Sequence, residues 1–217
     1  NNGGGVFENG FEGAVYVKGN DVVVAYAGTD QSRDMLEDLV LFASFPSQLV
    51  DAAQLYFYAK THYPGANISF TGQSLGGGLA SVMGVFFNRP AVVFDSAPFQ
   101  PSIANPATLL GVSALVAAGN LDFRDAAFEE LLYAAAIPVY YQTLTATRAF
   151  NNVSPFNIVN ETLSNLPFEA FRISRESSVE FALGGYGPDA NPRFVETMWL
   201  HDVAWPSVYL LSERFGP

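Results

Sequence analysis

The chain has 217 residues, of which 49% are hydrophobic and 14% charged, a composition that excludes an intrinsically disordered chain and suits one domain with a sizeable core. The net charge of −11 makes nucleic acid an unfavourable partner and disfavours adsorption to anionic membranes, because both require a basic face. The absence of cysteine excludes disulfides, thiolate metal sites and a cysteine nucleophile.

The chain begins with Asn1-Asn2-Gly3-Gly4-Gly5, without an initiator Met or a basic-then-apolar signal segment. We therefore expect a piece cut from a longer chain or a processed form, with residues 1–13 as a loop or tail. The acidic, cysteine-free composition slightly favours a secreted protein, although acidic surfaces are also common in the cytoplasm. No run approaches the roughly 18 apolar residues of a membrane span.

Two β-rich runs come next, at 14–17 and 21–27, and the turn residues Lys18-Gly19-Asn20 between them predict a hairpin. The second run is nearly all apolar, which predicts a strand in the middle of a sheet. It ends in Gly28-Thr29-Asp30, where the glycine permits a sharp bend. Such a bend can aim the N–H of Thr29 into a site as an oxyanion donor; an ordinary loop is the alternative.

The centre of the chain holds a strand–turn–helix pattern. After a helical pattern at 46–60, the apolar run Ile68-Ser69-Phe70-Thr71 predicts a buried strand. It leads into Gly72-Gln73-Ser74-Leu75-Gly76, and from Leu75 small and apolar residues predict a helix. Gly-x-Ser-x-Gly in this context is the pattern of a nucleophile elbow, whose glycines leave room where strand and helix pack closely. Ser74 is therefore the candidate nucleophile, and an incidental Gly-rich turn is the alternative.

A buried strand at 91–94 follows the predicted helix and ends in Asp95-Ser96-Ala97-Pro98. The alternation of strands and helices predicts a mostly parallel central sheet with helices on both faces. Residues 101–167 show no convincing strand, and we interpret them as a helical cap or lid insertion in a single α/β domain spanning 1–217. Additional helical packing is the alternative. The insertion carries helical patterns at 107–118 and 125–136.

The catalytic base has few candidates, because a serine hydroxyl needs an adjacent base and the chain has only two histidines. His62 stands at a helix end, at the opposite end of the next strand from Ser74, where a histidine usually serves the helix terminus. His201 lies far downstream, which fits the order Ser, acid, His of α/β-hydrolases. We therefore predict His201 as the base, with a structural histidine as the alternative.

The acid of such a triad accepts a hydrogen bond from the imidazole and is expected on a loop after a sheet strand. Glu176, which follows the strand-like run at 168–174, is the best placed carboxylate between Ser74 and His201. Asp95 and Asp189 remain as alternatives. The second oxyanion donor is expected to be the backbone N–H of Leu75, directly after the nucleophile.

Three segments resemble class 3 (fungal-lipase-like) α/β-hydrolases. The run T-G-Q-S-L-G-G-G-L-A resembles the nucleophile segment of that family, and V-V-V-A-Y-A-G-T-D resembles its oxyanion strand, with Ala27 where the family has Arg. The turn at 95–98 stands in place of the family's Gly-Ser-Pro turn. The resemblance covers roughly residues 13–100, and it implies a lipase, phospholipase or esterase that uses Ser74, with Thr29 and Leu75 as the oxyanion hole.

The predicted activity is the hydrolysis of acyl esters through a Ser-His-acid triad and an acyl-enzyme intermediate. Acyl transfer or thioester hydrolysis by the same triad, and a non-catalytic binding module of a larger protein, are the alternatives. Nineteen Phe, ten Tyr and the apolar insertion favour a lipid or other apolar ester, with transient contact to a lipid surface. No cofactor or metal is expected, since no Lys follows the Gly-rich turn and the histidines are not clustered.

Overall fold

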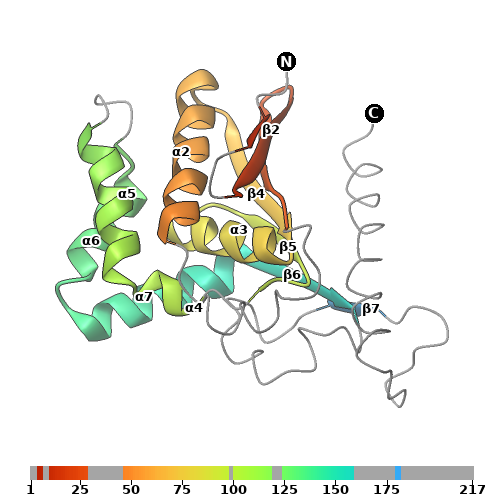
Figure 1. Ribbon diagram of the computed structural model, residues 1–217. Coiled ribbons are helices and arrows are strands. Elements are labelled where there is room, and N and C mark those ends of the chain that lie inside the picture. Colours follow the sequence, from red (N-terminus) through yellow and green to blue (C-terminus); the bar gives the residue numbers. More distant parts are fainter. Residues whose placement is uncertain are drawn as a thin grey trace, which may run out of the picture.

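The computed structural model describes residues 4–6, 10–28, 46–97, 100–118, 124–158 and 179–181, and these form one sheet with helices packed on it (Figure 1). The strands lie side by side in chain order, the first three antiparallel and β3 to β7 parallel, which confirms the predicted, mostly parallel sheet. They are β1 (Gly4–Val6), β2 (Glu12–Lys18), β3 (Asp21–Tyr26), β4 (Asn67–Gln73), β5 (Ala91–Phe94), β6 (Val153–Ile158) and β7 (Val179–Phe181).

The helices in the described residues cover one face of this sheet, since α3 contacts both α2 and α7 as well as β4 and β5. The sequence also predicts helices on the second face, and among the described residues no helix covers that face. The helices are α2 (Pro46–His62), α3 (Leu75–Phe86), α4 (Gln100–Ile103), α5 (Pro106–Ala118), α6 (Ala126–Ala134) and α7 (Pro138–Asn152).

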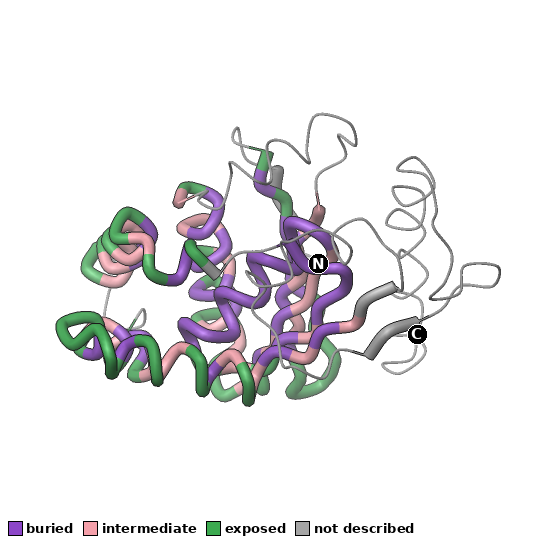
Figure 2. Tube along the Cα trace, turned by 90° about the horizontal axis from the view of Figure 1, so that it is seen from below, coloured by how far each residue is buried: buried purple, intermediate pink, exposed green. Residues whose placement is uncertain are grey.

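The core lies between the sheet and this helical layer (Figure 2). Val22, Val24 and Tyr26 of β3 are buried and alternate with partly exposed neighbours, as the period of two in a strand requires. All residues of α3 are buried, because its small side chains let the helix lie directly on the strands. Aromatic rings fill the space toward α2, where Tyr56 stacks on Phe87 with 4.0 Å between ring centroids. The predicted nucleophile segment is therefore built into the centre of the fold.

A buried carboxylate ties α6 to α2. Asp125 accepts hydrogen bonds from the Tyr56 hydroxyl at 2.6 Å and from Lys60 Nζ at 3.1 Å. The same side chain caps α6, because its other oxygen accepts from the N–H groups of Ala127 and Phe128. Burial and the nearby Asp125 charge raise the pKa of Tyr56 well above its usual value. The hydroxyl therefore stays protonated and able to donate.

Most predicted elements are confirmed with small shifts of their ends, but the prediction that residues 1–13 form a loop or tail is wrong, because this range contains β1 and the start of β2, which pair with each other. The hairpin between β2 and β3 turns at Gly19, whose φ of +60° is a conformation that glycine adopts without strain. The helix predicted at 46–60 continues to His62, and the strand predicted at 91–94 coincides with β5. The patterns at 107–118 and 125–136 correspond to α5 and α6.

The prediction that 101–167 holds no sheet strand is wrong, because β6 pairs with β5 on one side and β7 on the other. Pro155 conceals this strand, since proline lacks an N–H and is rare in interior strands. The helix α7 was also missed; its Pro138 suggests a chain break, yet it occupies the first turn, where proline is tolerated. The helical insertion in the described residues thus runs from α4 to α7 and ends at Asn152.

Candidate active site

Ser74 stands at the junction of β4 and α3 in the strained backbone conformation that the sequence predicts. Its φ is 55° and its ψ −124°, values that a residue with a side chain adopts at a cost on the order of 1–3 kcal/mol. The turn places the side chain at the carboxyl end of a central parallel strand, where α/β folds bind ligands. Such strain persists only where the surrounding structure enforces it.

Three backbone hydrogen bonds hold this turn in place. The Ser74 N–H donates to the Phe94 carbonyl of β5 at 3.0 Å. The Ser74 carbonyl accepts from the N–H of Gly78 at 3.1 Å and from the N–H of Ala97 at 2.9 Å. The turn is thus fixed to β5, to the first turn of α3 and to the loop after β5, so the serine side chain is presented from a rigid frame.

The glycines flanking Ser74 are required by close packing. A Cβ placed on Gly72 would lie 2.3 Å from the carbonyl atoms of Gly76. A Cβ on Gly76 would lie 2.1 Å from the Tyr26 carbonyl oxygen and 2.7 Å from that of Ala27. The first turn of α3 therefore rests on the ends of β3 and β4 with no room for a side chain, which confirms the predicted role of both glycines.

Ser74 is 3% exposed, and its buried hydroxyl has no hydrogen-bond partner among the described residues. A buried polar atom without a partner is costly, so its place in a native fold calls for a functional explanation. His201, the predicted base, lies outside the described residues, as do Thr29, Glu176 and Asp189. The structure thus describes the predicted nucleophile and leaves its predicted base as a prediction.

The end of β3 lies against the elbow. A Cβ placed on Gly28 would lie 3.1 Å from the Gln73 carbonyl oxygen and 3.4 Å from Ser74 Cβ. Gly28, the residue before Thr29, therefore lies close against Gln73 and Ser74. On the other side of Ser74, Leu75 opens α3, where N–H groups of the first turn lack acceptors within the helix and the helix dipole is positive.

Asp95 is the only predicted triad acid among the described residues. It is 1% exposed, follows the carboxyl end of β5 and has a φ of 40°. Its N–H donates to the Phe156 carbonyl of β6 at 2.9 Å. Since β5 is the parallel neighbour of β4, Asp95 lies at the same edge of the sheet as Ser74.

The strand order also adds a candidate acid that the sequence analysis missed. β6 ends at Ile158, and the first carboxylate after it in the sequence is Glu161, outside the described residues. The sequence pattern does not indicate β6, because Pro155 conceals it, and so gives no sign that Glu161 follows a strand. β7 begins at Val179, so Glu176 precedes that parallel strand in the chain.

His62 stands at the end of α2, as predicted. Its Nδ1 is 2.9 Å from the Tyr58 carbonyl oxygen, and its ring stacks on Tyr58 with 3.9 Å between centroids. The whole of β4 separates this helix end from Ser74 in the chain. His62 therefore serves the helix terminus, and its rejection as the base is consistent with the structure.

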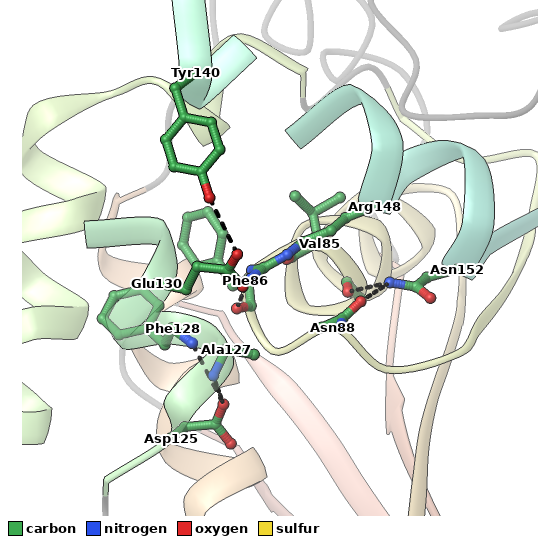
Figure 3. Close-up of polar contacts among 11 residues, drawn as sticks. Val85, Phe86, Asn88, Asp125, Ala127, Phe128, Glu130, Tyr140, Arg148 and Asn152 are labelled. Carbon is green, nitrogen blue, oxygen red and sulfur yellow. Dashed lines mark hydrogen bonds and ion pairs between the residues drawn. The ribbon is translucent and has the colours of Figure 1, made fainter. Parts of the chain in front are cut away.

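The far end of α3 is clamped by the insertion (Figure 3). Arg148 of α7 is 3% exposed, and its Nη1 donates to the carbonyls of Val85 and Phe86 at 3.1 and 3.2 Å. Its Nη2 donates to Glu130 of α6 at 2.7 Å, which balances the buried charge. A cation at a helix C-terminus also matches the helix dipole. The helix that begins directly after the predicted nucleophile Ser74 is thus held at both ends.

Neither a metal site nor a membrane-spanning helix is found in the part of the chain that the structure describes. No group of three or more His, Asp or Glu side chains there is arranged to hold a metal ion. None of its helices is both long enough and apolar enough to cross a bilayer.

A mostly parallel sheet with a strained serine between a central strand and a buried helix defines an α/β-hydrolase. A model of the phospholipase-like family, described as the Tle-like phospholipase domain, matches residues 5–119. This match covers more than half of the chain, and the protein belongs to that family. It is thus a domain of the lipase, phospholipase and esterase kind.

Two further kinds of likeness were found. A segment of 61 residues is 43% identical to atg15, a lipase-like protein of Penicillium rubens, and covers 28% of this chain but only 8% of that protein. A Pyrococcus furiosus esterase is 12% identical, with a TM-score of 0.42 over 99% of this chain and 90% of the esterase. A Staphylococcus aureus protein of unknown function is 10% identical, with a TM-score of 0.40 over 97% and 98%. Both TM-scores are below 0.5, so the assignment to the α/β-hydrolase fold rests on the strand order of the sheet and on the strained turn at Ser74.

Proposed function

We propose that this protein is a serine ester hydrolase of the lipase type, with Ser74 as nucleophile. The observation that carries the proposal is the Ser74 geometry at the strand–helix junction: a backbone with positive φ and a buried hydroxyl that has no partner among the residues the structure describes. Membership in the phospholipase-like family supports it. The direct test compares the parent chain with Ser74→Ala on triglycerides, phospholipids and p-nitrophenyl esters.

In the proposed mechanism Ser74 Oγ attacks the ester carbonyl carbon while His201 accepts the hydroxyl proton. The tetrahedral intermediate collapses, the imidazolium returns that proton to the leaving alcohol, and an acyl-enzyme remains. Water, deprotonated by His201, then attacks the acyl carbon; the bond to Ser74 Oγ breaks, the acid leaves, and the imidazolium returns the proton to Ser74 Oγ. A carboxylate that accepts from the imidazole keeps the ring in the required tautomer.

We further propose that the N–H groups of Thr29 and Leu75 form the oxyanion hole. The contact of Gly28 with the elbow and the position of Leu75 at the start of α3 support this pair. Both donors would be fixed before the negative charge develops on the carbonyl oxygen. Losing one such donor typically lowers kcat by about 10²–10³.

We also propose the narrower kinship with class 3 lipases, a single domain over 1–217, and an apolar acyl lipid as substrate. The matching segments around Ser74 support membership in the class 3 lipases. The apolar composition of helices α5 and α6, beside the core, supports a substrate with an apolar acyl chain. In this proposal the insertion α4 to α7 forms the cap of the site. Its α6 and α7 are fixed to the end of α3, and the Tyr141 hydroxyl, which donates to the Ile103 carbonyl, ties α7 to α4.

Replacing the triad acid by its amide is expected to lower kcat by about 10⁴-fold, because the base is then held in the wrong tautomer. The strand order favours a carboxylate that follows a parallel strand in the chain, namely Asp95, Glu161 or Asp189, over Glu176, which precedes β7. We therefore expect Asp95→Asn, Glu161→Gln or Asp189→Asn to show this loss, and Glu176→Gln to retain a near-parent rate. The measurement is turnover of a soluble p-nitrophenyl ester, with folding checked by circular dichroism. Near-parent rates in all four variants would contradict the triad.

A further inference from the structure

A second buried hydroxyl lies beside the predicted nucleophile. Ser96, in the loop after β5, is 1% exposed, and its Oγ has no hydrogen-bond partner among the described residues. The next residue of this loop, Ala97, donates its N–H to the Ser74 carbonyl at 2.9 Å, so the loop is bound directly to the elbow. A buried polar atom without a partner is costly, and its place in a native fold calls for an explanation.

A strained turn holds Ser96 in this position. Asp95, directly before it, has a φ of 40°, in the left-handed region that a residue with a Cβ adopts only where its surroundings enforce it. On one side the Asp95 N–H donates to the Phe156 carbonyl of β6 at 2.9 Å. On the other side Ser96 packs on α3, since a Cβ placed on Gly77 would lie 3.0 Å from its Cα and from its Cβ. The hydroxyl is therefore fixed between the end of β5 and the first turn of α3.

Ser96 lies on the opposite side of the elbow from the proposed oxyanion hole. A Cβ on Gly76 would meet the Tyr26 carbonyl of β3, whereas a Cβ on Gly77 would meet Ser96 after β5. The proposed donor Thr29 belongs to the β3 side, because it follows that strand in the chain. Every candidate acid and the predicted base follow β5, and the strands beyond β5 are β6 and β7. The Ser96 hydroxyl is thus on the side from which the triad is expected to be completed.

The candidate acid closest in the chain to this side of the elbow is the one after β6. β6 runs two residues past the last residue that it pairs with on β5, so its end at Ile158 is level with Ser96. Glu161 comes three residues later, a stretch that spans at most about 10 Å, and neighbouring strands lie about 5 Å apart. Asp189 follows β7, one strand further from β5. Asp95 does not accept from Ser96 Oγ, which has no partner among the described residues.

We propose that Ser96 is a positioning residue of the triad, whose hydroxyl donates a hydrogen bond to the Glu161 carboxylate. A triad acid accepts from the imidazole with one oxygen, and a donor on its other oxygen fixes the orientation of the carboxyl group. The bond also favours the ionised form of the acid, which the imidazolium requires. The hydroxyl proton stays on Ser96 throughout. The inference rests on the proposed function, since it adds a residue to the same site.

The test compares Ser96→Ala with the parent chain in p-nitrophenyl ester turnover and in thermal unfolding. We expect kcat to fall about tenfold to a hundredfold, the loss typical of one hydrogen bond to a charged group, and KM to stay within about twofold. The Tm is expected to stay the same or rise, because the hydroxyl has no partner to lose among the described residues.

Thr108→Val is the matched control for Ser96→Ala. Thr108 lies on α5, is 0% exposed, and its hydroxyl also lacks a partner among the described residues. Because α5 packs on α2, away from β5, kcat is expected to stay at the parent value. Loss of the same factor in both variants would show a general effect of buried hydroxyls and would overturn the role of Ser96.

A double-variant cycle identifies the acceptor, with the rate of fluorophosphonate labelling of Ser74 as the readout. In the Glu161→Gln chain, Ser96→Ala is expected to lower this rate by less than about twofold, because the carboxylate that Ser96 orients is already gone. An unchanged kcat in Ser96→Ala, a clear fall in its Tm, or the full loss in the Glu161→Gln chain would overturn the proposal. Turnover that persists in Ser74→Ala would instead overturn the proposed function, whereas its loss there with parent-like Ser96→Ala removes only this inference.

Discussion

Ser74→Ala is expected to lower ester hydrolysis by about 10⁴- to 10⁶-fold while the protein stays folded. The nucleophile is lost, and no other hydroxyl occupies the elbow. Stability is expected to be unchanged or slightly higher, because the substitution removes a buried polar atom that has no partner among the described residues. The measurements are p-nitrophenyl ester turnover and thermal unfolding of both chains.

Ser81 provides the matched control for this substitution. It is a buried serine on the same helix, and its hydroxyl donates to the Gly77 carbonyl one turn earlier at 2.8 Å. Ser81→Ala is expected to keep turnover near the parent value, since Ser81 lies two turns into α3, away from the elbow. Near-parent turnover in Ser74→Ala, or equal losses in both variants, would contradict the assignment of Ser74.

Gly76→Ala is expected to destabilise the protein by about 3 kcal/mol or more, a fall in Tm of roughly 10 °C, and to abolish turnover. The new methyl would meet the Tyr26 carbonyl oxygen at 2.1 Å, and this neighbour is backbone in a central strand that cannot move aside. Relief requires α3 to separate from β3, which displaces Ser74 and Leu75 together. Denaturant unfolding and ester turnover measure the two effects.

Gly84→Ala on the same helix is the control for this glycine substitution. Its methyl would lie 3.1 Å from Ala91 Cβ and 3.2 Å from the Arg89 carbonyl oxygen, contacts that need only small adjustments. Alanine also improves helix propensity by up to about 1 kcal/mol. We expect a stability change within about 1 kcal/mol and retained turnover. If Gly76→Ala were no worse than Gly84→Ala, the close packing of the elbow would not be the constraint on this position.

The sequence predicts the first half of the fold well, because the signals there are local. Alternating apolar residues, a Gly-containing turn and glycines at fixed spacing each reflect a contact within the element or with its nearest neighbour. The second half depends on distant contacts. β6 contains Pro155, and it becomes a strand because β5 and β7 flank it. α7 has a polar composition, and it is held by Arg148 on the end of α3 and by Tyr141 on α4.

The candidate site also has a part that the sequence predicts and a part that depends on distant contacts. The elbow was predictable, since the strained turn at Ser74 and the room left at Gly72 and Gly76 follow from a five-residue pattern. The acid was not, because its position depends on which strands exist and in which order they stand. Missing β6 left Glu161 out of consideration and placed weight on Glu176. The role of His201 follows from chain order and stays a prediction.

The central claim is that Ser74 is an activated nucleophile, and labelling with a fluorophosphonate tests it most directly. An activated serine displaces fluoride from the probe and forms a covalent bond from its Oγ to phosphorus. We predict that mass spectrometry of the digested parent chain finds the probe on the peptide containing Ser74, and that His201→Ala slows labelling strongly. A folded parent chain that remains unlabelled at Ser74 would contradict the account. So would a Ser74→Ala variant that takes up as much probe as the parent chain.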